Sequence, residues 1–270
     1  MTDMSSPPSE NTWKIGPFAE TLVALRFLTR LPIPFVRTVD LPPLAEGMRF
    51  FPLAGAVIGA IASATLIGAN MLGLPSLLAA ALALAVGVLV TGALHEDGLA
   101  DVADGFGGGR SREDRLEIMR DSRIGTYGTI ALCLTFLARA AIYETLSGAQ
   151  PLTILALLAS SAAFSRALVV DLLWATRPAR SDGLSVFAGR PGKRSALFSL
   201  LTGGIGTAAA VGLVLSPEIA VIAIIAGGLV LAGMRALAMR QIGGQTGDVC
   251  GAVQVMAELA MLTVFAATVG

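Results

Sequence analysis

Residues 51–74 read FPLAGAVIGAIASATLIGANMLGL, a run without one charged side chain. Crossing a bilayer as a helix takes about 20 apolar residues, so this run is long enough to span a membrane. Six further apolar runs of similar length lie at 76–94, 126–146, 152–174, 196–215, 219–237 and 249–269. None of them alternates polar and apolar residues as barrel strands do. The sequence therefore predicts an all-α, polytopic transmembrane helical bundle of about seven spans.

The composition of the whole chain agrees with a membrane location. Of its 270 residues, 54% are hydrophobic and 14% are charged, whereas soluble domains carry about 25% charged residues. The 19 Lys and Arg balance the 19 Asp and Glu, which removes the overall basic field expected of a nucleic-acid-binding protein. Cys133 and Cys250 have no metal-ligand spacing, and we interpret both as small core residues.

The N-terminal region differs from the apolar runs. Residues 1–17 are polar and lack the basic and apolar segments of a cleaved signal, so we expect a short cytoplasmic tail. Segment 18–31 is apolar but short and contains Arg26 and Arg30, which favours an interfacial or partly inserted helix. No repeat or linker divides the rest, so 18–270 is interpreted as a single integral membrane domain.

Basic residues are concentrated in alternate loops. The connections near Pro75, at 148–151 and at 216–218 contain no Lys or Arg, whereas the intervening loops, above all 110–123 and 177–194, contain nearly all of them. Because Lys and Arg are retained on the cytoplasmic side, the pattern predicts seven spans with the N-terminus inside and the C-terminus outside. If residues 18–31 formed an eighth span, the N-terminal tail would lie on the other side of the membrane and the orientation of the remaining spans would not change. Glycine pairs within the apolar runs would also permit close packing in a homo-oligomer.

The acidic residues form one concentrated group. Segment 95–105 reads HEDGLADVADG and directly follows an apolar run. If it is helical, Asp97, Asp101 and Asp104 stand at i, i+4 and i+7 and share one narrow face. Crowded carboxylates repel one another unless a cation lies among them, and hard oxygen ligands suit Mg²⁺ or Mn²⁺ held together with substrate phosphate and water. The segment therefore indicates a divalent-cation site.

Two alternatives concern the surroundings of this group. The acids could instead form a solvated loop paired with Arg110, Arg112 and Arg115, but their spacing and their place at the edge of a span favour the metal site. His95, the single histidine, is a candidate general base, although a lone His beside acids is more often a hydrogen-bonding or ligand-positioning group.

Two later polar segments carry further candidates. DSRIGTYG, at 121–128, brings Asp121 and Arg123 to the start of a span, and the planar fork of Arg123 suits phosphate. GGQTGD, at 243–248, places Asp248 before the last span and is either a flexible turn or part of the same site.

Two cations lie inside apolar runs. Arg139 and Arg166 must there be paired, reach the interface or line a cavity. We consider snorkelling for Arg139, and for Arg166 either pairing with Asp171 or contact with substrate.

These segments resemble the signature segments of the cobalamin (5'-phosphate) synthase family, the adenosylcobinamide-GDP ribazoletransferases. The resemblance rests on HEDGLADVADG, on RLEIMRDSRIGTYG from Arg115 and on GGQTGDVCGA from Gly243, with FLTRLPIP from Phe27 and FFPLAG from Phe50 similar to its N-terminal motifs. It extends from about residue 18 to the C-terminus. Glu96 and Cys250 depart from the family's pattern, which leaves open whether Glu96 joins the metal site.

The resemblance implies a Mg²⁺-dependent transferase in the bacterial inner membrane, with its active site facing the cytoplasm, acting late in cobalamin biosynthesis. Such an enzyme joins adenosylcobinamide-GDP to α-ribazole or α-ribazole 5'-phosphate and releases GMP. The implied metal ligands are Asp97, Asp101, Asp104 and Asp121; the catalytic candidates are Asp97, Asp101, Asp104 and His95; the substrate-binding candidates are Arg123, Arg166 and Asp248.

Two other functional classes also use acids in membranes. A CDP-alcohol phosphotransferase or a prenyltransferase has clustered aspartates, but the DGxxAR motif of the former is absent here. A divalent-cation transporter predicts carboxylates near the middle of the spans. The aspartates singled out above all fall at one expected membrane face, which favours an enzyme that meets large cytoplasmic substrates.

Overall fold

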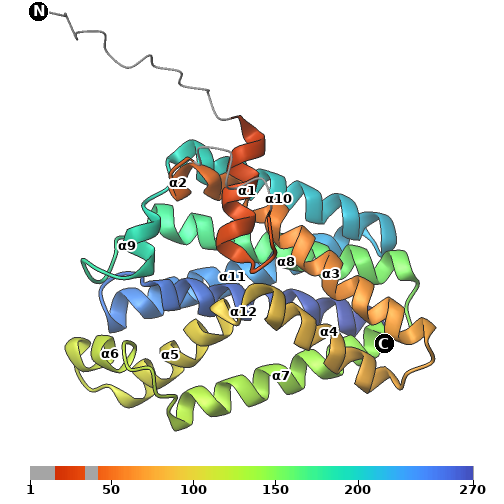
Figure 1. The fold of residues 1–270 in the computed structure, drawn as a ribbon, viewed down its shortest axis with the longest axis horizontal. Helices are drawn as coiled ribbons and strands as arrows, with labels where there is room; N and C mark the ends of the chain where they lie inside the picture. The colour runs from red at the N-terminus through yellow and green to blue at the C-terminus, as the bar shows by residue number, and fades with distance from the viewer. Residues whose placement is uncertain (1–15, 34–41, 270) are drawn as a thin grey trace, which may run out of the picture.

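The structure is a computed structural model that describes residues 16–33 and 42–269. Within these ranges it is α-helical, and its one β-type contact is an isolated bridge between Pro178 and Gln245. Residues 1–15 of the expected tail lie outside the described part. Figure 1 shows the long helices running along the molecule, which confirms the all-α bundle.

Six helical segments are long and apolar enough to cross a membrane. The first combines α2 (Leu44–Gly47), a 3-10 turn η2 (Met48–Phe50) and α3 (Phe51–Met71). The others are α7 (Thr126–Leu146), α8 (Pro151–Ala175), α10 (Lys193–Val214), α11 (Pro217–Gln241) and α12 (Gly247–Val269). Each agrees with a predicted span to within a few residues, apart from the short lead-in to α3.

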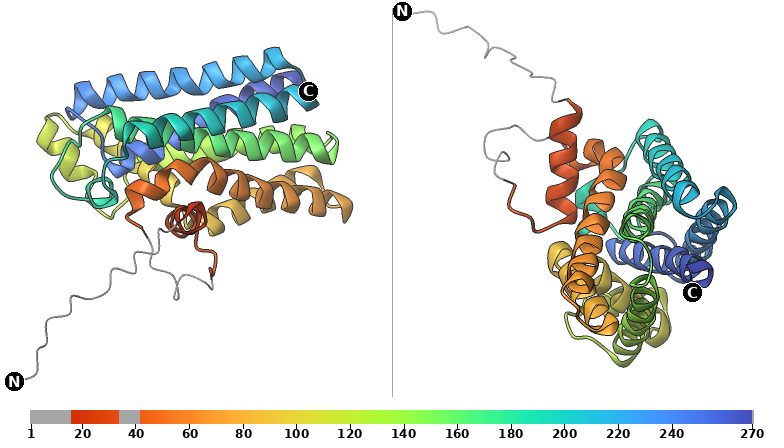
Figure 2. Two further views of the ribbon diagram at one scale, coloured as in Figure 1. Left: turned by 90° about the horizontal axis from the view of Figure 1, so that it is seen from above. Right: turned by 90° about the vertical axis from the view of Figure 1, so that its right-hand side faces the viewer.

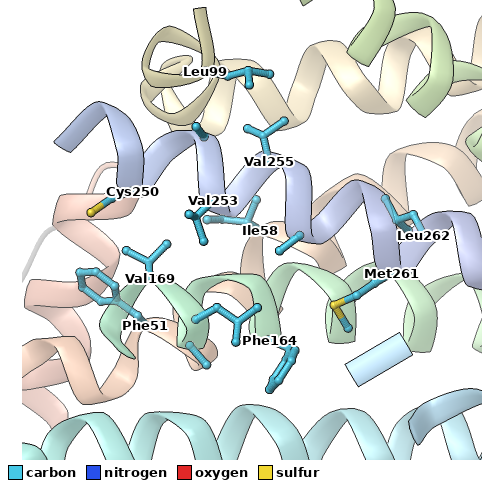
Figure 3. Close-up of a cluster of buried hydrophobic side chains, with 14 of the residues drawn as sticks. Phe51, Ile58, Leu99, Phe164, Val169, Cys250, Val253, Val255, Met261 and Leu262 are labelled. Carbon is cyan, nitrogen blue, oxygen red and sulfur yellow. The ribbon is translucent and has the colours of Figure 1, made fainter. Parts of the chain in front are cut away.

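The core of the bundle surrounds α8, which packs against α3, α10 and α12. Gly55 and Gly59 allow the α3 backbone to lie directly on α8, because a Cβ atom at either position would come within 2.4 Å of an α8 carbonyl oxygen. Figure 3 shows apolar side chains such as Val169 and Val253 filling the space between α8 and α12. Gly203 and Gly227 likewise face α8, so one glycine of each pair, 203–204 and 227–228, serves packing within the chain. Homo-oligomer formation stays a prediction.

The predicted span 76–94 is wrong in one respect, because the helix breaks before its end. Helix α4 (Ser76–Thr91) is followed, after two residues, by α5 (Leu94–Gly108) at an angle of 91°. Gly92 and Ala93 both have left-handed backbone angles, with φ of 67° and 60°, and these end α4 and turn the chain into α5 at about a right angle. The pair counts as a seventh span only if both helices form one broken crossing.

A segment far away in sequence holds this bend in place. The backbone N–H of Arg30 donates to the carbonyl of Val90 at 2.7 Å. The Arg30 side chain lies over Gly92, where a Cβ atom would be 2.0 Å from the Arg30 Nε atom. Glycine suits position 92 because its φ is positive and because a larger residue would have to displace the Arg30 side chain.

The N-terminal helix α1 (Pro17–Leu28) has 12 residues, about 18 Å in length, which is too short to cross a bilayer. It lies across the long helices rather than along them (Figure 2). Leu22, Val23 and Leu28 are buried, and Glu20 forms an ion pair with Arg49 just before α3. The helix is therefore packed on the bundle and is not one of the six spans.

Two short helices mark one end of the molecule. These are α6 (Arg112–Ile118) and α9 (Leu184–Ala188), on the left in Figure 1. We call this the arginine-rich end, because the basic loops 110–123 and 177–194 lie there.

Candidate active site

The acidic segment forms helix α5, so the condition under which Asp97, Asp101 and Asp104 share one face is met. Helix α5 packs against α7 and α12. At its crossing with α12, a Cβ atom on Gly98 would be 2.7 Å from the carbonyl oxygen of Asp248, and one on Gly251 would be 2.9 Å from that of His95. Glycines on both helices thus allow direct backbone contact, and this contact brings Asp248 beside the acidic helix.

A cavity of about 440 Å³ lies between the bent α4–α5 pair and α7. Asp97 and Asp101 of α5 line it, together with Glu96. Asp121, Ser122 and Arg120 approach it from the loop that joins α6 to α7. Three acids of α5 and one acid of the loop after α6 therefore line one space, beside the 91° bend between α4 and α5.

Asp101 has an unusual electrostatic environment. It is half-buried, and burial together with neighbouring negative charge raises the pKa of its carboxyl to about 7. The neighbouring carboxylates are those of Asp97, Asp248 and Asp104. Arg180 opposes this shift without cancelling it. A cation placed here would relieve the repulsion.

The alternative of a solvated loop with paired arginines does not fit the contacts. Arg112 donates to the backbone carbonyls of Ile242 and Ala179, and Arg115 donates to that of Gln241. In the part of the chain that the structure describes, no arginine of loop 110–115 pairs with an α5 aspartate. These arginines instead tie α6 to the loops beside it.

The polar segment before α12 is an ordered part of the site rather than a free turn. Gln245 forms two backbone hydrogen bonds with the loop after α8. Its N–H donates to the carbonyl of Arg177 at 2.9 Å, and its carbonyl accepts from the N–H of Ala179 at 2.8 Å. Gly244 is required at this point, since a Cβ atom would lie 2.4 Å from the Arg177 carbonyl oxygen. The two loops are therefore joined side by side.

This junction brings in Arg180, a residue that the sequence reasoning counted only as a basic loop residue. Arg180 Nη2 lies 3.5 Å from an Asp248 carboxylate oxygen, and its side chain is only 13% exposed. Asp248 also accepts a hydrogen bond from the Thr246 hydroxyl at 3.1 Å. The sole sequence signal was the polar segment RPARSDG that follows α8.

Asp104 faces the start of α7. Its two carboxylate oxygens accept the backbone N–H groups of Gly125 at 2.7 Å and Gly128 at 2.9 Å. These N–H groups have no partner inside α7, because they belong to its first turn. Asp104 therefore caps α7 from the neighbouring helix, and its role as a metal ligand stays a prediction.

Replacing Asp104 by Ala should lower the free energy of unfolding by about 1–3 kcal/mol, because two charge-assisted hydrogen bonds are lost. Asn, which keeps one acceptor oxygen, should lose less. Thermal unfolding of detergent-solubilised variants measures both. Unchanged stability in the Ala variant, combined with lost activity, would speak against the capping role and for a direct part in metal binding.

Asp121 lines the cavity, and Arg123, which is next to two lining residues in sequence but does not line the cavity itself, pairs with it. Arg123 Nη2 is 2.6 Å from Asp121 Oδ2. Hydrogen bonds from the Arg123 side chain and backbone lower the pKa of Asp121 to about 2. The Arg123 side chain is 87% exposed and that of Asp121 is 39% exposed, so a phosphate would compete with Asp121 for the Arg123 fork.

The remaining candidates lie in a buried charge network in the middle of the bundle. Arg139 donates to Glu96 at 3.1 Å and to Glu258 at 3.2 Å, and Arg166 lies 3.4 Å from Glu258. Arg139 is therefore paired and does not snorkel, and the carboxylate partner of Arg166 is Glu258 rather than Asp171. Arg166 is 3% exposed, and its contact with substrate stays a prediction.

His95 and Glu96 border this network. His95 is buried and lines a small internal space beside Arg139 and Arg166, not the larger cavity. Glu96 lines both, with one carboxylate oxygen held by Arg139. The acid that departs from the expected pattern thus connects the charge network to the cavity.

The carboxylates of the cavity suit Mg²⁺ only as part of its coordination sphere. Within residues 16–33 and 42–269, no three His, Cys, Asp or Glu side chains lie close enough to hold a metal ion by themselves. Mg²⁺ is commonly held by only one or two carboxylates together with substrate phosphates and water. Asp97 and Asp101, with the crowded negative charge around them, fit that smaller share of the coordination sphere.

Fold and site together define a polytopic helical membrane protein with a carboxylate-lined cavity near one end of its bundle. Comparison with known proteins identifies it further: the chain belongs to the cobalamin-5-phosphate synthase family, whose sequence profile matches residues 20–266. This finding agrees with the resemblance read from the motifs.

Several relatives named adenosylcobinamide-GDP ribazoletransferase are similar over nearly their whole length, and three of them serve as examples. The protein of Azorhizobium caulinodans is 48% identical over 251 residues, covering 90% of this chain and 94% of the relative. That of Mesorhizobium japonicum is 43% identical, with 91% and 92% covered. That of Xanthobacter autotrophicus is 46% identical, with 90% and 94% covered. No solved structure matches the chain.

Proposed function

We propose that this chain is an adenosylcobinamide-GDP ribazoletransferase, which joins adenosylcobinamide-GDP to α-ribazole or its 5'-phosphate and releases GMP. Family membership and the names of the relatives support the reaction. The position of the active site is supported by one observation: Asp97, Asp101 and the loop that carries Asp121 line the same cavity. A diphosphate substrate requires such a meeting of acids, a cation and phosphate-binding groups.

The reaction is a displacement at phosphorus. The acceptor's ribose hydroxyl oxygen forms a bond to the phosphorus next to cobinamide, the bond from that phosphorus to the GMP oxygen breaks, and GMP departs with the bonding electrons. A carboxylate of the cavity accepts the hydroxyl proton. Asp97 and Asp101 would hold Mg²⁺, which would supply positive charge to the phosphate oxygens.

The chain's own groups complete the positioning. Arg123, paired with Asp121, presents a planar fork to phosphate, and Arg180 holds Asp248 at the crossing of α5 and α12. Holding both substrates in line is the main contribution that a protein makes to phosphoryl transfer.

The proposed orientation places the arginine-rich end in the cytoplasm of a bacterial inner membrane. Its support is the concentration of Lys and Arg in the loops at this end. The cavity is lined by residues of one of these loops, so the large water-soluble donor would meet it from the cytoplasm.

The test is turnover by purified protein in liposomes, with adenosylcobinamide-GDP and α-ribazole or α-ribazole 5'-phosphate. GMP and the matching cobalamin product should appear with Mg²⁺ and stop when the metal is chelated. An absence of product from well-folded protein, while an active relative works alongside, would contradict the transferase. Turnover that survives chelation would contradict the role of Mg²⁺ alone.

A further inference from the structure

The cavity between α5 and α7 changes character from one wall to another. Asp97 and Asp101 form its acidic wall, whereas Val88 of α4 and Leu132 and Phe136 of α7 form an apolar wall. Val88, Leu132 and Phe136 also line a groove between α4 and α7 whose lining has no charged residue. The cavity is therefore continuous, through these three residues, with an apolar surface of the spanning helices.

The cavity is large enough for only one of the two substrates of the proposed reaction to fit as a whole. Its volume of about 440 Å³ falls in the range of about 300–1,000 Å³ that holds compact small molecules. A donor that carries a corrinoid ring, an adenosyl group and GDP is far larger and can insert only its diphosphate part. A single nucleoside, by contrast, fits as a whole.

The polarity of the cavity matches one orientation of such a nucleoside. The base of α-ribazole is a dimethylbenzimidazole, which is flat, uncharged and apolar, and its sugar carries hydroxyl groups. An aromatic base gains from burial against an aromatic ring and an aliphatic side chain, which Phe136 and Leu132 provide. A ribose hydroxyl belongs beside the carboxylates that could accept its proton.

We propose that the apolar wall formed by Val88, Leu132 and Phe136 binds the aromatic base of the acceptor nucleoside and directs its ribose toward Asp97 and Asp101. This inference rests on the proposed function and assigns the acceptor's place within it. The diphosphate of the donor then enters from the loop that carries Asp121 and Arg123. The two substrates thus meet at the carboxylates, where an in-line displacement needs both to be held in place.

The experiment measures equilibrium binding of radiolabelled α-ribazole to the full-length protein in lipid nanodiscs, without donor and without Mg²⁺. Phe136→Ala and Leu132→Ala should each weaken binding about tenfold or more, because a hydrophobic pocket discriminates by that factor for small changes in size. Donor binding, measured separately, should change less than twofold. Leu134→Ala is the matched control, since Leu134 is on the same helix, is 62% exposed and lies outside the cavity lining.

Three results would overturn the assignment. They are an absence of saturable binding to the wild type, equal affinity of wild type and Phe136→Ala, and weakened donor binding with acceptor binding intact. Equal affinity of the wild type and Phe136→Ala is the result expected if lipid chains, and not the acceptor base, occupy this wall. Phe136→Leu, which keeps an apolar side chain, should retain part of the affinity and serves if the Ala variant does not fold.

The outcome is separable from that of the transferase proposal. If the protein releases GMP but Phe136→Ala binds the acceptor as tightly as the wild type, the assignment of the base site is wrong and the transferase proposal stands. Phe136-dependent binding in a protein that never releases GMP would leave the base site in place and remove the transferase.

Discussion

Replacing Asp97 or Asp101 by Asn is expected to lower kcat for GMP release by about 10²–10³-fold, the loss typical of removing one charged group that stabilises a transition state. Asn keeps the shape of the side chain and removes the charge. Both residues line the cavity, and burial, together with the surrounding carboxylates, raises the pKa of Asp101 to about 7. A site that binds a cation through these charges should therefore lose both catalysis and metal affinity.

The measurement is steady-state turnover in liposomes over a range of Mg²⁺ concentrations, with Mn²⁺ binding followed separately by electron paramagnetic resonance. Each variant should bind Mn²⁺ more weakly than the wild type. Glu117→Gln is the control, because Glu117 is an exposed acid on the nearby helix α6 that does not line the cavity. A fully active Asp97→Asn variant would remove Asp97 from the site.

Much of this architecture could be predicted because uninterrupted apolar runs leave few alternatives. The span 126–146 coincides with α7, and 152–174 lies within α8. The aspartate spacing gives a shared face once the segment is helical, and the structure shows that it is. In each case the deciding information is local in sequence, either the length of an apolar run or the helical period.

The bend at Gly92 and Ala93 could not be predicted in the same way. The letters TGAL around it carry no charge that would mark the end of a span, and Ala is an ordinary helix former. At the bend, Arg30 of the N-terminal segment lies over Gly92 and its backbone N–H donates to Val90. A contact over that sequence distance leaves no trace in hydropathy or periodicity.

The candidate site could be predicted only in part, because some of its contacts also join residues that are far apart in sequence. Asp97, Asp101 and Asp121 meet around the cavity as expected, whereas Asp104 is engaged with α7. Arg180 was passed over because loop cations were used only to set orientation. Glu258 was passed over because one acid barely lowers the hydropathy of a long apolar run, although the partners of Arg139 and Arg166 had to be sought among such acids.

Glu258→Gln is expected to destabilise the protein by about 3–5 kcal/mol, the usual cost of leaving a buried charge unpaired. Glu258 accepts hydrogen bonds from Arg139 at 3.2 Å, Arg166 at 3.4 Å and the Gln254 amide. Two arginines and two glutamates balance in this network, so removal of one glutamate leaves an excess positive charge. Arg166, with no other carboxylate partner in the described part of the chain, loses most.

Thermal unfolding in detergent, followed by loss of the monodisperse peak, measures this cost. Glu144→Gln is the matched control, since Glu144 is an exposed acid on α7 with no ion pair among the described contacts. The double variant Glu258→Gln with Arg166→Gln restores the charge balance, and it should recover much of the lost stability because Glu96 and Arg139 remain paired. A double variant no more stable than Glu258→Gln would show that shape and hydrogen bonding, rather than balanced charge, keep these helices together.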